Sequence, residues 1–204
     1  MPATPVQPLT LEAFLQLPYI EESPAWEYMP AWENTPTGEP TGQAQQKPMP
    51  QTQHSRLQFK LCEAINQVGE GDEIACAFPE LRCTFGDRSI VPDISVLRWE
   101  RIPMTPDGDI MNKFNSYPDW AIEILSPDQS ANRVTANILH CLKYGCELGW
   151  FIDPKDRSIL VFRSKQEPII FAREDSLPVL AGIDLDIHVS QIFDWLKMKR
   201  IATS

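Results

Sequence analysis

The chain has 204 residues, 43% of them hydrophobic, and carries a formal net charge of −10. A chain of this length can bury a full core, and we expect one α/β domain with an N-terminal arm. No apolar run is long enough to span a bilayer and no signal segment is recognisable, so we expect a soluble, cytoplasmic protein. The acidic total argues against sequence-blind adhesion to nucleic acid, which depends on Lys and Arg neutralising phosphates, but it does not exclude a nuclease.

Half of the acid excess lies at the start of the chain, because the first 50 residues hold six acids and the single base Lys47. The five cysteines form no CxxC pair. Their odd number predicts reduced, mostly buried thiols rather than disulfides or a structural zinc site.

The first 51 residues are predicted to form a short helix and an irregular arm. Residues 9–17 have helical spacing of apolar side chains, with Thr10 as a candidate N-cap, and Pro18 ends the helix. Residues 18–51 are rich in Pro, Thr, Gln and Gly, which favours irregular structure. We therefore divide the chain into this arm, 1–51, and a folded domain, 52–204.

The rest of the chain alternates predicted helices and strands. Apolar residues at helical spacing predict a core helix over 53–68, which Gly69 ends. A second helix is predicted to begin at Ser126, with Pro127 at the first helical position, and to end at Gly145. A last helix is expected from Ser190 to about Lys199, and strands are predicted over 73–78, 80–85, 88–97, 119–125, 148–153, 158–163 and 168–172.

Two of these strands each contain one acid. Asp93 shares a strand face with Val91 and Leu97, and Glu123 shares one with Ala121 and Leu125, because side chains alternate along a strand. Acids are rare on such faces unless they are paired or bind a metal. If the two strands are antiparallel neighbours, facing positions place Cβ atoms about 5 Å apart, which suits two carboxylates that bind one divalent cation.

The order of elements, with Pro-Asp in one strand and Glu in a later strand before a helix, resembles the PD-(D/E)xK restriction-endonuclease-like fold. More narrowly, the chain resembles the Uma-type restriction endonuclease family. The matching pieces are Leu-Thr-Leu-Glu-Ala-Phe-Leu at 9–15, His54, Val91-Pro92-Asp93, Ile122 to Pro127, Tyr144-Gly145 and Trp150 to Pro154. The resemblance implies a mixed β-sheet flanked by helices.

The resemblance also implies a site. Asp93 and Glu123 would be metal ligands for Mg²⁺ or Mn²⁺, with the Ile124 carbonyl completing the set. The wider fold places a lysine two residues after the glutamate, where this chain has Leu125. In this family the lysine often comes from the following helix instead, at the position that aligns with Asn137 here. Our hypothesis is that Arg133, one helical turn before Asn137, replaces the lysine as an electrostatic stabiliser.

Two further residues belong to the predicted site. The family usually supplies one more acid from an aromatic-Glu segment before a β-hairpin, and Trp26-Glu27-Tyr28 fits the start of that pattern. We expect the Pro/Thr/Gly-rich insertion to replace the hairpin. Glu33, in the repeated Pro-Ala-Trp-Glu unit, is a second candidate for the acid, and we favour Glu27. His54 is either a helix-cap or core histidine or a site residue.

From these features we predict a homodimeric, metal-dependent endonuclease that cleaves DNA phosphodiester bonds. Losing one transition-state donor typically costs about 10²–10³ in rate, so activity can survive Leu125 in the lysine position. The main alternative is a catalytically silent nuclease fold that acts as a binding or regulatory protein. A general interaction protein that uses the arm is a third reading.

Overall fold

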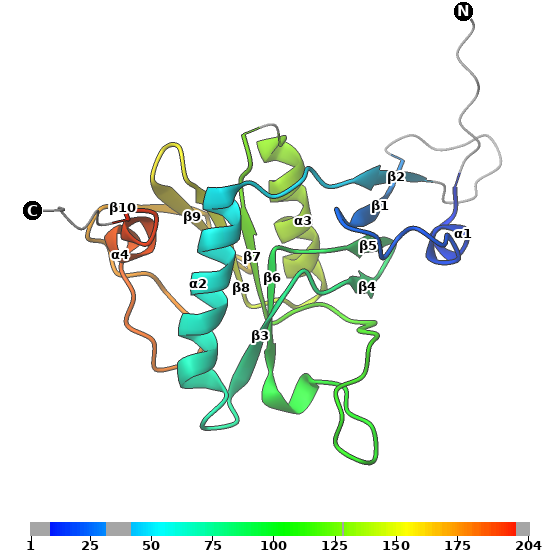
Figure 1. The fold of residues 1–204 in the computed structure, drawn as a ribbon, viewed down its shortest axis with the longest axis horizontal. Coiled ribbons are helices and arrows are strands. Elements are labelled where there is room, and N and C mark those ends of the chain that lie inside the picture. Colours follow the sequence, from blue (N-terminus) through cyan, green and yellow to red (C-terminus); the bar gives the residue numbers. More distant parts are fainter. Residues whose placement is uncertain (1–8, 32–41, 128, 199–204) are drawn as a thin grey trace, which may run out of the picture.

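The computed structural model describes residues 9–31, 42–127 and 129–198. Its larger sheet has the strand order β10-β9-β8-β7-β6-β3 (Figure 1). Only the β7–β8 pair is parallel, and α3 (Ala131–Tyr144) connects these two strands. The six strands are β3 (Ala75–Pro79), β6 (Ile94–Arg98), β7 (Trp120–Ile124), β8 (Leu148–Asp153), β9 (Ser158–Arg163) and β10 (Ile169–Ala172).

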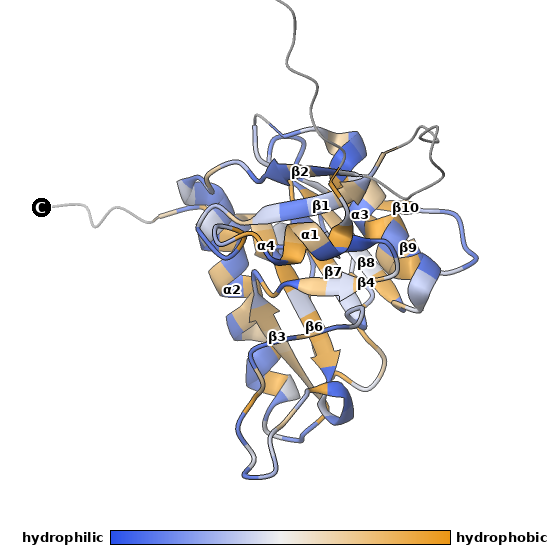
Figure 2. Ribbon diagram, turned by 90° about the vertical axis from the view of Figure 1, so that its right-hand side faces the viewer, coloured by the Kyte–Doolittle hydropathy of each residue, from blue (hydrophilic) through white to orange (hydrophobic). Residues whose placement is uncertain are grey.

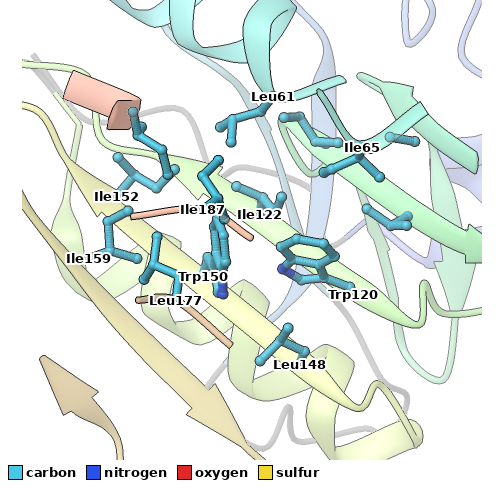
Figure 3. Close-up of a cluster of buried hydrophobic side chains, with 14 of the residues drawn as sticks. Leu61, Ile65, Trp120, Ile122, Leu148, Trp150, Ile152, Ile159, Leu177 and Ile187 are labelled. Atoms are coloured by element: carbon cyan, nitrogen blue, oxygen red, sulfur yellow. The ribbon is translucent and has the colours of Figure 1, made fainter. Parts of the chain in front are cut away.

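Helices α2 (Thr52–Gly69) and α3 cover opposite faces of this sheet, which makes it a mixed α/β core. The fully buried Leu61 and Ile65 of α2 pack in the same cluster as Trp120 and Trp150 (Figure 3). The two indole rings make an edge-to-face contact, with centroids 4.6 Å apart. This cluster packs against one face of β7. Helix α3, which carries the buried polar residues Asn137 and His140, covers the opposite face.

We predicted an irregular arm over residues 18–51, but part of this segment forms regular structure. The predicted helix is present as α1 (Leu11–Leu15), and Thr10 Oγ1 accepts the N–H of Ala13 at 3.1 Å. Strands β1 (Trp26–Pro30) and β2 (Gly42–Gln46) then form an antiparallel hairpin, so the hairpin expected to be missing exists. The division of the chain at residue 51 stays a prediction.

This hairpin belongs to a second sheet, of order β2-β1-β5-β4, with β4 (Cys83–Phe85) and β5 (Arg88–Ile90). Strand β2 could not be predicted from the sequence because its residues are polar or small and show no apolar alternation. Its colouring in Figure 2 is accordingly mostly hydrophilic. Gly42 is required there, since a Cβ would lie 2.2 Å from the Met29 carbonyl oxygen. Glu33 lies outside the described residues.

Two of the wrongly predicted boundaries lie beside the facing acids. The single strand over 88–97 is divided into β5 and β6, which lie in different sheets, and Val91-Pro92-Asp93 links them. Helix α3 begins after Ser130 rather than Ser126. The supposed capping residues instead form a turn, in which the Ser126 N–H donates to Gln129 Oε1 at 3.3 Å and the Gln129 N–H donates to the Ser126 carbonyl at 3.0 Å.

The remaining elements follow the predicted order. Gly145 ends α3 with φ of 122°, as expected for a glycine C-cap. The last helix, α4 (Val189–Asp194), is shorter than predicted, and Lys199 lies outside the described residues. A 3₁₀ turn, η1 (Trp99–Arg101), follows β6. All five cysteines are free thiols, and no helix in the described ranges has the length and apolarity to cross a membrane.

Candidate active site

Asp93, the residue directly before β6, lies opposite Glu123 of the neighbouring antiparallel strand β7. Ile94 of β6 is paired with Ile122 of β7, and one step further along this register sets Asp93 against Glu123. Each acid is only 1% exposed. Asp93 Oδ2 accepts the Ile124 N–H at 2.7 Å, which fixes the carboxylate against the end of β7. The strand pairing that the sequence argument assumed is therefore present.

A lysine does reach these acids, but from the arm. Lys47, directly after β2, places its Nζ 2.6 Å from Asp93 Oδ1 and 4.0 Å from Glu123 Oε2. The same ammonium donates to the Val91 carbonyl at 2.7 Å, and the side chain is 8% exposed. Sequence reasoning missed this residue, although Lys47 is the only base in the first 50 residues.

The charges of the three groups depend on one another. Burial would lower the pKa of Lys47, but the neighbouring carboxylates, above all Asp93, raise the pKa above its ordinary value. Burial likewise opposes ionisation of Asp93, yet the Lys47 charge and His54 lower the pKa of Asp93 to about 2. The pKa of Glu123 is raised by burial and by the charge of Asp93. Lys47 is therefore an ammonium, and Asp93 is its ionised partner.

His54 lies beside Asp93 and does not cap its helix, whose N-cap residue is Gln51. Its Nε2 is 3.3 Å from Asp93 Oδ1, and its Nδ1 is 3.1 Å from Ser126 Oγ. One turn along α2, Gln58 donates from Nε2 to the Asp93 carbonyl at 2.7 Å. Gln58 and Ser126 were not predicted as site residues, although Gln58 has the i, i+4 spacing from His54 that places both on one helix face. Together they fix the position of Asp93.

Glu27 is the third buried acid of the group. It is 2% exposed, and its Oε1 accepts the Val91 N–H at 3.0 Å. Asn137 donates from Nδ2 to Glu27 Oε1 and to Glu123 Oε1, both at 3.2 Å, and so joins the two acids. Arg133 lies beside Glu27, with Nη2 3.3 Å from Oε2. No contact joins Arg133 to Asp93 or Glu123, so the cation beside the facing carboxylates is Lys47 rather than Arg133.

The donor set fits a hard divalent cation. Glu123 Oε2 is buried and has no hydrogen-bond partner, and it lies on the side where Lys47 already supplies positive charge. Within the described ranges no three His, Cys, Asp or Glu side chains converge to hold a metal ion. Mg²⁺ does not require such a cage, because it is commonly held by one or two carboxylates and keeps several waters.

Little open space surrounds the acids. The cavity bordered by Lys47, His54 and Asp93 has a volume of about 10 Å³, close to that of one water probe. A hollow of about 1100 Å³ lies beyond His54 and Ser126, and its wall includes Leu125, the start of α2 and the turn after β8. Another hollow, of about 630 Å³, lies between β1, β2 and the start of α3, with Arg133 in its wall.

A mixed sheet with helices on both faces, and an acid directly before β6 that faces an acid of β7, define a restriction-endonuclease-like fold. The Uma2 family model, described as "Putative restriction endonuclease", matches residues 11–190, and the chain belongs to this family. The chain is also similar to the crystal structure of a "putative nuclease belonging to DUF820" from Anabaena variabilis ATCC 29413. The identity is 47%, the TM-score is 0.84, and the match covers 93% of this chain and 100% of the other. No curated protein matches the chain.

Proposed function

We propose that this protein is a metal-dependent endonuclease that hydrolyses DNA phosphodiester bonds, with Mg²⁺ or Mn²⁺ as its cofactor. The observation that carries the proposal is the buried pair of Asp93 and Glu123 on facing strand positions with the Lys47 ammonium against them. An unpaired buried acid is costly, and so two acids kept side by side in a core indicate a cation-dependent role. Family membership supports the same class of activity.

Asp93 and Glu123 would hold the cation, together with the Ile124 carbonyl. The Leu125 N–H donates to Ile152 of β8, so the backbone groups of Ile124 face the other way, toward the side of Asp93. A bound divalent cation supplies a Lewis acid for the phosphoryl oxygen and an activated water as nucleophile. The protein's contribution is to orient the carboxylates by hydrogen bonds from the Ile124 N–H and Asn137, while Gln58 holds the backbone carbonyl of Asp93.

Lys47 would take the part of the lysine that is absent from position 125. Its ammonium can donate to a phosphoryl oxygen as negative charge develops there, which does not require proton transfer. Three residues would position Glu123 indirectly. Arg133 contacts Glu27, and Asn137 hydrogen-bonds both Glu27 and Glu123. His54 would likewise position Asp93.

The proposal is tested by titrating Mg²⁺ and Mn²⁺ against cleavage of plasmid, single-stranded and branched DNA. Asp93→Asn and Glu123→Gln keep the shape of each side chain and remove its charge. Glu100→Gln, at an exposed position in η1, is the matched control. We expect metal-dependent cleavage by the wild type and the control and a loss of at least about 10²-fold in both site variants. Cleavage that persists in folded Asp93→Asn would refute the proposal.

A catalytically silent binding protein is the alternative, and one observation favours it. Asp93 already has partners for both oxygens, since Oδ1 contacts Lys47 and His54 and Oδ2 accepts the Ile124 N–H. The acids of the site are therefore compensated in part without a metal. This alternative predicts metal binding, measured by calorimetry, with no cleavage of any of the three substrates above the level of the variants.

A further inference from the structure

One face of β2 presents a row of hydrogen-bond donors that leads away from the facing acids. In the hairpin register Gln45 lies opposite Glu27, so both are on the face that turns toward α3. The ladder continues past the end of β2, because the Lys47 N–H donates to the Ala25 carbonyl at 2.8 Å. Gln43, Gln45 and Lys47 therefore share one face. At a rise of about 3.3 Å for each residue, the row is about 13 Å long, and it begins beside the facing acids.

The hollow of about 630 Å³ lies along this row. Gln43 and Gln45 belong to its wall on the side of β2, and Arg133 belongs to its wall at the beginning of α3 (Figure 1). Both glutamines are exposed, so their amides are accessible from the hollow. The side chain of Arg133 is 15% exposed, and within the described residues its only hydrogen bond runs from Nη2 to Glu27. A guanidinium has five N–H donors, so most of those of Arg133 remain for a ligand.

The charge of the wall distinguishes this hollow from the rest of an acidic chain, which has 28 acids and a net charge of −10. None of the described residues in its wall is Asp or Glu, and Arg133 gives it one positive charge. The larger hollow beyond His54 has Asp153 and Asp156 as well as Lys155 in its wall. Carboxylates repel phosphates, so the acid-free hollow is the one of the two that suits a DNA backbone.

We infer that the hollow between β2 and the beginning of α3 holds the DNA strand on one side of the cleaved bond. The inference rests on the proposed function, because it takes the phosphate beside Lys47 as the one that is cleaved. From there the strand continues along β2, where Gln45 and Gln43 donate to its phosphates and sugars, and Arg133 contacts a phosphate from the opposite wall. At one phosphate for about each 3.4 Å of duplex axis, the row accompanies several nucleotides.

Fluorescence anisotropy of a labelled DNA titrated with the full chain tests the inference, with Ca²⁺ in place of Mg²⁺ as the hard cation. Gln43→Glu and Gln45→Glu keep the shape of each side chain and place a negative charge in the hollow, and we expect each to weaken DNA binding about tenfold or more. Gln45→Lys should tighten binding and steepen the slope of log K against log salt by about 0.7–0.9, because it neutralises one more phosphate. Gln166→Glu, at an exposed position in the turn after β9, is the matched control and should leave binding unchanged.

Gln53→Glu makes the same change at an exposed position in the wall of the larger hollow. Three outcomes would overturn the inference: a wild type that binds no DNA, Gln43→Glu and Gln45→Glu chains that bind as tightly as the wild type, or a loss of binding in Gln53→Glu instead, which would place the DNA in the larger hollow. Urea unfolding of each variant establishes that it is folded. The inference is judged by binding and the proposed function by the cleavage lost in Asp93→Asn, so the failure of one is distinguishable from the failure of the other.

Discussion

Replacing Lys47 with methionine should separate the structural and chemical roles of the lysine. Methionine keeps an unbranched chain of similar length and removes the charge. The ammonium lies 2.6 Å from Asp93 Oδ1, and both side chains are more than nine-tenths buried. Removing one partner of a buried ion pair typically costs about 3–5 kcal/mol of unfolding free energy, since the other charge is left uncompensated.

For a chain of this size that loss corresponds to a decrease in Tm of about 6–20 °C, at about 2–4 °C for each kcal/mol. A divalent cation held by Asp93 and Glu123 should restore part of the lost unfolding free energy. At a concentration 100 times its Kd, a ligand of the folded state contributes about 2.7 kcal/mol. The wild type should bind the metal more weakly than Lys47→Met, because its own ammonium repels the cation from the same carboxylates.

The assay is urea unfolding of wild type and variant with and without Mg²⁺ or Mn²⁺, followed by DNA cleavage at saturating metal. Lys60→Met is the matched control, because Lys60 pairs with Glu63 on the surface of α2, where such pairs contribute about 0–1 kcal/mol. We expect cleavage by Lys47→Met to fall about 10²–10³-fold even when the metal has restored its stability. A variant as stable as the wild type, with no metal response, would refute the reasoning.

Three further changes give separate tests. Arg133→Met should slow single-turnover cleavage less than Lys47→Met does, because Arg133 contacts Glu27 and not the facing carboxylates. Gly86→Ala should lose at least about 1–2 kcal/mol in urea unfolding, since φ is +60° and a Cβ would lie 2.2 Å from the Tyr144 ring. Burial, aided by the Arg88 charge, lowers the pKa of His140 to about 4 from the ordinary 6.5. The unfolded chain therefore binds the proton first, so stability should be complete above pH 6.5 and fall as the pH drops toward 4, less steeply in His140→Gln.

The parts of the fold that sequence predicted are those where burial leaves a local pattern. Helix α2 shows apolar residues at helical spacing, and β7 and β8 show runs of buried side chains, so their positions were found within two residues. The polar strand β2 has no such pattern, because pairing with β1 holds it rather than a buried face. The cap at Ser126 was misplaced because the same side-chain hydrogen bond closes a turn as readily as a helix start.

The same distinction explains the candidate site. Asp93 and Glu123 could be predicted because an acid within an apolar stretch stands out in the sequence. Lys47 could not, because it lies 46 positions from Asp93 in the chain. What the site requires is an ammonium near the carboxylates, and no rule fixes the segment that supplies it. Because β2 pairs with β1, the residue that follows β2 is directed to the link between β5 and β6. Only the three-dimensional arrangement contains that information.

The dependence of the site on the arm leads to a last prediction, which concerns the proposed division at residue 51. Val91 has its N–H bonded to Glu27 and its carbonyl bonded to Lys47, so a chain of residues 52–204 loses partners for both groups and for Asp93. Deleting the arm also removes the pairing of β1 with β5 and admits water to these groups and to the three acids, so the fragment loses both strand pairing and burial at the end of the larger sheet. We expect 52–204 to show no cooperative urea transition by near-UV circular dichroism, whereas the full chain unfolds cooperatively. A 52–204 fragment with the midpoint of the full chain would mean that the arm contributes nothing to the fold, and the contacts of Glu27 and Lys47 would then have to be assigned to function alone.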